Sequence, residues 1–166
     1  MKNQIIFAFT VLSLFLVSCA TDNTNDNLID PITLRCALTY ARAGDTITFD
    51  PAIFPPGAPA AIMLTAALPA ITQGNLTVDG SGAGVILDGS NLAADIPGLV
   101  LNSDGNTVNG LQIIDMTSSG MVVLGDDNTI GEAGTRQVAS PTNLAGPPAS
   151  PSNVVAGNQG SGIRIA

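Results

Sequence analysis

The chain of 166 residues contains no histidine and no tryptophan, and it has only two cysteines. The absence of histidine excludes Ser-His-Asp catalysis, Cys-His catalysis and imidazole-bound zinc within this sequence. Aromatic residues make up only 4% of the chain, which weakens any carbohydrate site built on aromatic stacking. The glycine-rich run from Gly80 to Gly84 lies between two predicted strands, so it is interpreted as a turn rather than a phosphate-binding loop.

Positive charge is scarce as well. Five Lys and Arg residues stand against thirteen Asp and Glu residues, and the formal net charge is −8. Nucleic acid requires a basic surface, so no nucleic-acid partner is expected. Acidic polysaccharides are disfavoured for the same reason, unless a metal ion bridges them to the protein.

Residues 1–19 predict an export signal. Lys2 precedes an almost uninterrupted apolar stretch from Ile5 to Val17. This stretch is shorter than the roughly 20 apolar residues of a transmembrane helix, and it fits the apolar core of a secretory signal. The following sequence LVSCA resembles a bacterial lipobox, which implies a lipid on Cys19 and attachment to the cell envelope, at the outer membrane or cell surface. The alternatives are an ordinary cleaved signal and an uncleaved anchor.

Residues 20–31 are polar and rich in Asn and Asp, so they predict a flexible tether. The next segment, from Thr33 to Ala43, has apolar residues at helical spacing, with Gly44 just beyond it where a helix often ends. A short helix in this place is expected to cap the open core of a solenoid. Cys36 lies on the apolar face of this helix and is expected to be a buried, inert thiol.

A repeat of 22 residues predicts the architecture. GLVL at 98–101 returns as GMVV at 120–123, and DGNTV at 104–108 returns as DDNTI at 126–130. Short apolar runs separated by Gly, Asn and Asp at a fixed period indicate an all-β solenoid with about 22 residues per coil. In this phase Val78, Val100 and Val122 share one column, and Ile86, Val108 and Ile130 share another. We expect Val100 and Val122 to face the interior.

One insertion interrupts the repeat. GIRI at 162–165 resembles GMVV but lies 42 residues further on, an excess of about one coil. Residues 133–152 are rich in Pro, Ser, Ala and Gly, and their removal restores the phase and aligns Ile113 with Val155. We interpret them as one protruding loop. Because the sequence stops within a predicted strand with no capping pattern, we expect it to be the N-terminal part of a longer protein.

These segments together resemble a known family. ITLRCALTYARAGDTITF, LTVDGSGAGVILDGS, NTVNGLQI and NVVAGNQGSGIRI are similar to the right-handed parallel β-helix repeat proteins of bacterial surfaces, in the pectate-lyase-like superfamily. The resemblance covers residues 32–166 and implies three parallel sheets around a dry core. It implies little about activity, because the superfamily includes lyases, hydrolases, adhesins and structural domains.

Two asparagines align one coil apart. Asn106 and Asn128 fall in the same column of the repeat, and Gly84 falls there too. The resemblance implies an internal asparagine ladder, in which carboxamides satisfy backbone groups at a bend. The alternative is a ligand site.

Asp104 and Asp126 align in the same way, with Asp127 adjacent. Carboxylates on neighbouring coils are separated by about 4.8 Å. Three interpretations stay open: ordinary turn residues, a shared Ca²⁺, or a catalytic pair at the ~5–5.5 Å separation of retaining glycosidases. Arg164 lies on a coil strand and is interpreted as a solvated side chain.

We therefore expect a lipid-anchored cell-surface module that contacts glycans or proteins without catalysis, in an adhesion role. One alternative is the N-terminal part of a polysaccharide lyase or glycoside hydrolase. The other is a purely structural stalk.

Overall fold

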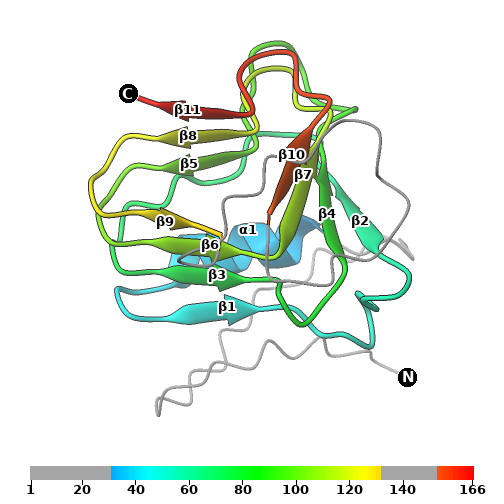
Figure 1. The fold of residues 1–166 in the computed structure, drawn as a ribbon, viewed down its shortest axis with the longest axis horizontal. Helices are drawn as coiled ribbons and strands as arrows, with labels where there is room; N and C mark the ends of the chain where they lie inside the picture. Colours follow the sequence, from blue (N-terminus) through cyan, green and yellow to red (C-terminus); the bar gives the residue numbers. More distant parts are fainter. Residues whose placement is uncertain (1–30, 132–152) are drawn as a thin grey trace.

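The computed structural model describes residues 31–131 and 153–166 as one short helix followed by β-strands. All strand pairings within these residues are parallel, and the strands form three sheets that surround a common interior (Figure 1). The fold is therefore mostly β and compatible with a parallel β solenoid. Sheet A contains β1 (Thr46–Thr48), β3 (Thr77–Asp79), β6 (Thr107–Asn109) and β9 (Thr129–Ile130); sheet B contains β2 (Ala60–Met63), β4 (Val85–Asp88), β7 (Leu111–Ile114) and β10 (Val154–Ala156); sheet C contains β5 (Leu99–Leu101), β8 (Met121–Val123) and β11 (Ile163–Ile165).

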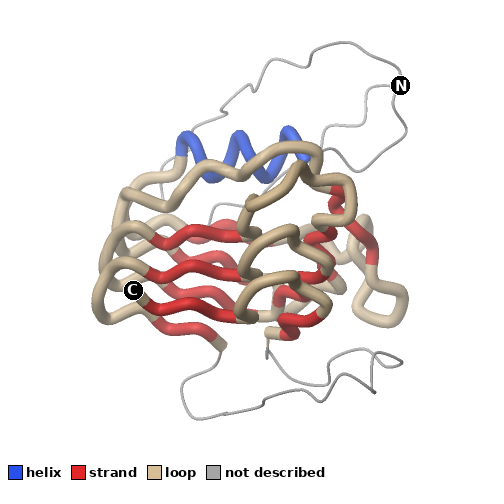
Figure 2. Tube along the Cα trace, turned by 90° about the horizontal axis from the view of Figure 1, so that it is seen from above, coloured by secondary structure: helices blue, strands red, loops and turns tan. Residues whose placement is uncertain are grey.

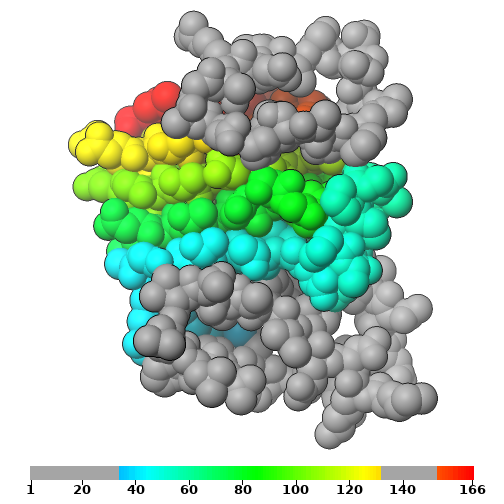
Figure 3. All heavy atoms as spheres, turned by 60° about the horizontal axis from the view of Figure 1, so that its bottom comes forward, coloured from blue at the N-terminus to red at the C-terminus, as the bar shows by residue number. Residues whose placement is uncertain are grey.

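Each coil contributes one strand to each sheet in the order C, A, B, and successive coils stack as bands along the molecule (Figure 3). The expected 22-residue coil holds from β5 to β8 and from β6 to β9. It is wrong for the earlier coils, because the sheet A register pairs Thr46 with Thr77 and Thr77 with Thr107, at spacings of 31 and 30 residues. The earlier coils have longer turns, which a fixed period cannot anticipate.

The varying coil length also corrects the predicted columns. Val78 pairs with Ile47 and Val108 in sheet A, so it does not share a column with Val100 and Val122 of sheet C. Ile86 pairs with Gln112 in sheet B and is likewise not in the column of Val108. The columns predicted within the 22-residue part are confirmed: Val100 pairs with Val122, and Val108 pairs with Ile130.

The orientation predicted for sheet C is wrong. Leu99 and Leu101 are 1% and 0% exposed, whereas Val100 between them is partly exposed; β8 repeats the pattern with Val122 outward. Side chains alternate across a strand, so the flanking residues face the core. Three consecutive apolar residues carry no alternation in the sequence, and therefore the sequence could not decide the orientation.

The helix α1 (Pro31–Tyr40) lies across the N-terminal end of the stack (Figure 2). The predicted helix is confirmed, with both ends about two or three residues earlier than expected. Leu34 and Leu38 are each 1% exposed and close the interior at this end. Beyond the helix, Gly44 adopts a φ of +87°, which L side chains rarely adopt.

Cys36 on α1 is partly buried and disulfide-bonded. The expectation of a buried free thiol is therefore wrong. The other cysteine of the chain, Cys19, lies outside the described residues, as do the predicted signal peptide, the tether up to residue 30 and the predicted loop at 133–152.

The register on either side of that loop agrees with the predicted phase. Val155 pairs with Ile113, and Ile163 pairs with Met121. The coil thus resumes its place after residue 152. Among the described residues, no helix is long and apolar enough to cross a membrane.

Candidate functional site

The turn between sheets C and A has the same geometry in successive coils. Asn75, Gly105 and Asp127 occupy one column and adopt positive φ values of 51°, 69° and 55°. Asn, Asp and Gly are the residues that tolerate this left-handed conformation most readily. Such a turn points the next backbone N–H along the solenoid axis, toward the following coil.

Asparagine side chains accept these N–H groups. The Oδ1 atom of Asn128 accepts the backbone N–H of Asn106 at 2.8 Å, and the Oδ1 atom of Asn106 accepts the N–H of Leu76 at 3.0 Å. The Nδ2 atom of Asn106 donates to the Ser103 carbonyl oxygen at 2.8 Å and to Asn128 Oδ1 at 2.8 Å. Asn106 is fully buried, so these bonds satisfy polar groups that have no access to water.

Gly84 does not belong to this column. Val85 pairs with Leu111, which places Gly84 beside Gly110 at the entrance to sheet B. Its ideal Cβ position would lie 2.5 Å from the Pro55 carbonyl oxygen, so this glycine allows a close backbone approach instead.

Two further asparagines, missed by the sequence reasoning, act in the same way at other turns. Asn153 Oδ1 accepts the Leu111 N–H at 3.0 Å, and Asn158 Oδ1 accepts the Met116 N–H at 2.9 Å. The available signal was a recurring dipeptide, in which a Gly or Asp with positive φ directly precedes an asparagine. Gly157 before Asn158 repeats the pattern of Gly105 before Asn106.

The aspartates singled out in the sequence lie in the C-to-A turns. Asp104, Asp126 and Asp127 are all exposed, and Asp104 Oδ1 accepts the backbone N–H of Asp126 at 2.8 Å. One carboxylate oxygen of Asp104 therefore links two coils. Among residues 31–131 and 153–166, no group of three or more His, Cys, Asp or Glu residues is arranged to hold a metal ion.

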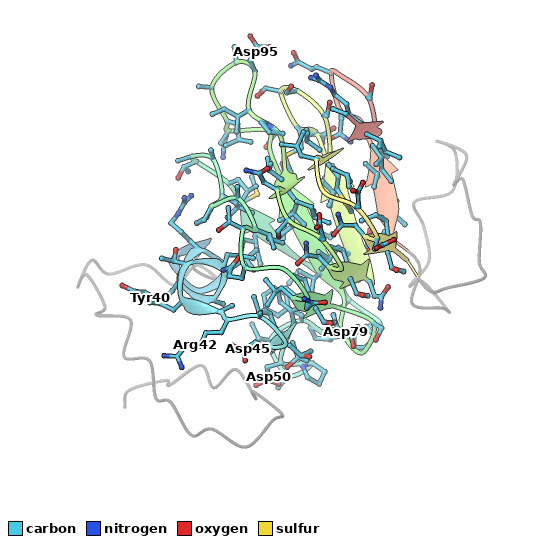
Figure 4. The ribbon with its side chains drawn as sticks, turned by 90° about the vertical axis from the view of Figure 1, so that its left-hand side faces the viewer. Tyr40, Arg42, Asp45, Asp50, Asp79 and Asp95 are labelled. Carbon is cyan, nitrogen blue, oxygen red and sulfur yellow. The ribbon has the colours of Figure 1, made fainter. Side chains whose placement is uncertain are left out.

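The arginine on a coil strand is also placed by the register. Arg164 is paired with Val122 in β8, which is paired with Val100, and its side chain is exposed on the outer face of sheet C. Figure 4 shows Asp45, Asp50 and Asp79 on one side of the molecule and Asp95 on the other.

The outer face of sheet A is a second candidate site. Thr46, Thr77, Thr107 and Thr129 form one continuous column, with one threonine per coil. All four are partly exposed, while the residues that follow them in β1, β3 and β6 are buried. The adjacent column is polar too, and contains Thr48, Asp79 and Asn109.

The other two sheets have different outer faces. In sheet B one outward column reads Ala61, Ile86, Gln112 and Val154, and the other reads Met63, Asp88, Ile114 and Ala156. In sheet C the outward column reads Val100, Val122 and Arg164. Only the face of sheet A is polar at each described strand position that points outward, so the molecule has one distinct hydroxyl-rich face.

No protein-family model, curated protein or solved structure matches this chain significantly.

Proposed function

We propose that this chain is a non-catalytic contact module of a cell surface, and that the outer face of sheet A is the surface with which it contacts an extended, uncharged glycan. The observation that carries the proposal is the threonine column of Thr46, Thr77, Thr107 and Thr129. Parallel strands lie about 4.8 Å apart, so the column offers hydroxyl groups at a regular interval along a straight line.

The chemistry of these groups favours a hydroxyl-rich polymer. Each threonine hydroxyl is both a donor and an acceptor, and the Asp79 carboxylate and Asn109 carboxamide extend this capacity in the next column. A regular row of such groups complements a polymer whose own hydroxyls recur along its length. The net charge of −8 opposes binding of polyanions, which is why an uncharged glycan fits better.

The fold assignment is part of the proposal. We infer that the solenoid is a right-handed β-helix of the pectate-lyase-like type. The sequence resemblance supports this inference, and so does the strong preference of crossover connections between parallel strands for the right hand.

We further propose that the module is exported and anchored through a lipid on Cys19, as the LVSCA sequence implies. A thioether-linked sulfur cannot also form a disulfide. Because the chain has only two cysteines, lipidation of Cys19 would leave Cys36 reduced or paired outside its own chain. Mass spectrometry of the protein from a bacterial envelope decides between these states. A diacylglycerol mass on the peptide beginning at Cys19, lost in Cys19→Ala, supports the anchor, whereas a Cys19–Cys36 linked peptide refutes it.

The glycan proposal is tested by replacing hydroxyls without changing side-chain shape. The double variant Thr77→Val/Thr107→Val keeps β-branched side chains in β3 and β6. Binding to a panel of immobilised neutral polysaccharides is compared with that of the parent chain. We expect at least a tenfold loss of affinity, because each lost hydrogen bond is equivalent to about a fivefold change.

The matched control is Val122→Thr, which makes the reverse exchange on the outer face of sheet C and should leave binding unchanged. Equal binding by the double variant would reject the threonine column as the contact surface. Turnover of any of the polysaccharides by the parent chain would reject the non-catalytic role.

A further inference from the structure

The C-terminal end of the described solenoid leaves interior positions open. Ile163 and Ile165 in β11 are 42% and 82% exposed, although their partners Met121 and Val123 in β8 are 0% and 6% exposed. The same change occurs in sheet A, where Val108 is fully buried and its partner Ile130 is not. One end of the apolar core is therefore exposed across more than one sheet.

The opposite end is closed by α1. Leu34 and Leu38 pack onto the first coil, and Gln73 Nδ-type contact is replaced by a side-chain bond in which Gln73 Nε2 donates to the Leu38 carbonyl oxygen at 2.7 Å. A head-to-tail stack of two copies is thus blocked, since the helix covers the surface that a second copy would need.

The turns show what fits the open end. In each of four places, the residue after a positive-φ residue donates its N–H to an asparagine of the next coil. The donors are Leu76, Asn106, Leu111 and Met116, and the acceptors are Asn106, Asn128, Asn153 and Asn158. Asn128 and Asn158 stand at the same place in the last coil, after Asp127 and Gly157. Within the described residues, nothing accepts their backbone N–H groups.

We propose that this end face is a docking surface for an extended polypeptide segment that adds as the next parallel coil and places an asparagine carboxamide over the Asn128 N–H. The exposed isoleucines provide the apolar contact, and the unpaired strand edges provide the main-chain hydrogen bonds. The occupant is thus defined chemically: a β-forming segment that carries an asparagine at the ladder position.

The chain itself supplies the sequence of a suitable probe. Ile163 to Ala166 correspond in register to Met121 to Leu124, which are followed by GDDNTIG at 125–131. Appending a second GDDNTIG directly after Ala166 should place a strand on β9 and a carboxamide above Asn128. We expect amide exchange at Asn128 to slow by about tenfold relative to the parent chain, the effect of a well-formed hydrogen bond.

The control probe is GDDATIG, which keeps the length and the apolar residue but lacks the carboxamide. It should leave exchange at Asn128 unchanged. Ile165→Ser in the chain carrying GDDNTIG should reduce the protection, and because Ile165 is exposed the parent fold tolerates this change.

Equal exchange at Asn128 with and without GDDNTIG, or equal protection by both probes, would overturn the proposal. A parent chain that sediments as a dimer and already protects Asn128, with Ile165→Ser restoring the monomer, would overturn it in favour of a second copy as the occupant. Tyr40→Ser, an exposed change on α1 at the other end (Figure 4), controls for nonspecific association through apolar side chains.

Discussion

The Oδ1 atom of Asn128 accepts both the backbone N–H and the side-chain Nδ2–H of Asn106 in the preceding coil, each at 2.8 Å. Asn106 in turn accepts the Leu76 N–H, so one line of carboxamides connects three coils through a buried turn. Because the groups concerned are buried, their loss would leave unsatisfied donors and acceptors in a dry interior.

Asn106→Ala should therefore destabilise the fold by about 1–3 kcal/mol, the cost of leaving buried polar groups unpaired. Urea unfolding followed by circular dichroism measures the change. Asn102→Ala, at an exposed position four residues earlier, is the control and should shift the midpoint little. Equal midpoints for both variants would show that the ladder contributes nothing to stability.

The two faces of β5 should respond differently to charge. Leu101→Asp places an unpaired carboxylate at a position that is 0% exposed and should abolish the cooperative thermal transition. Val100→Asp, on the outer face, should preserve that transition. Calorimetry of the two variants checks the corrected orientation; a folded Leu101→Asp beside an unfolded Val100→Asp would reverse it.

Gly98 should not tolerate a side chain. An ideal Cβ at this position would lie 2.5 Å from the Gly120 carbonyl oxygen and 2.9 Å from Ile113 Cγ2. Gly98→Ala should cost about 1–3 kcal/mol, as overpacking does in well-packed cores. Gly82→Ala is the matched control, since nothing lies within 4 Å of its ideal Cβ, and its midpoint should stay close to that of the parent.

Removal of residues 133–152 should leave a foldable chain if the new joint has the right backbone. Gly131 and Asn153 face each other across the gap, with 4.0 Å between the ideal Cβ of Gly131 and Asn153 Nδ2. After the deletion Glu132 takes the place that Gly110 has in the preceding coil, where φ is +66°.

The deletion should therefore be combined with Glu132→Gly, because a glutamate is strained at positive φ. We expect a single cooperative unfolding transition for this variant and a lower melting temperature when Glu132 is retained. Loss of cooperativity in both forms would show that the deleted segment belongs to the core.

The sequence by itself determined the class of fold and much of its order. The apolar runs separated by Gly, Asn and Asp predicted stacked β-coils, and the repeat placed Val100 beside Val122 and Ile163 beside Met121. The helical spacing from Leu34 to Ala41 predicted the cap. These features depend on local pattern and on short-range repetition, which a linear sequence records directly.

The tertiary structure decided the rest. The register of the longer coils depends on turns whose length no period fixes, and therefore Val78 and Gly84 lie in columns other than those predicted. In strands with consecutive apolar residues, only packing around the interior selects Leu101 over Val100 for the core. The threonine face and the open ladder at Asn128 arise only when coils of unequal length are stacked in register, because parallel pairing joins residues that are far apart in the chain.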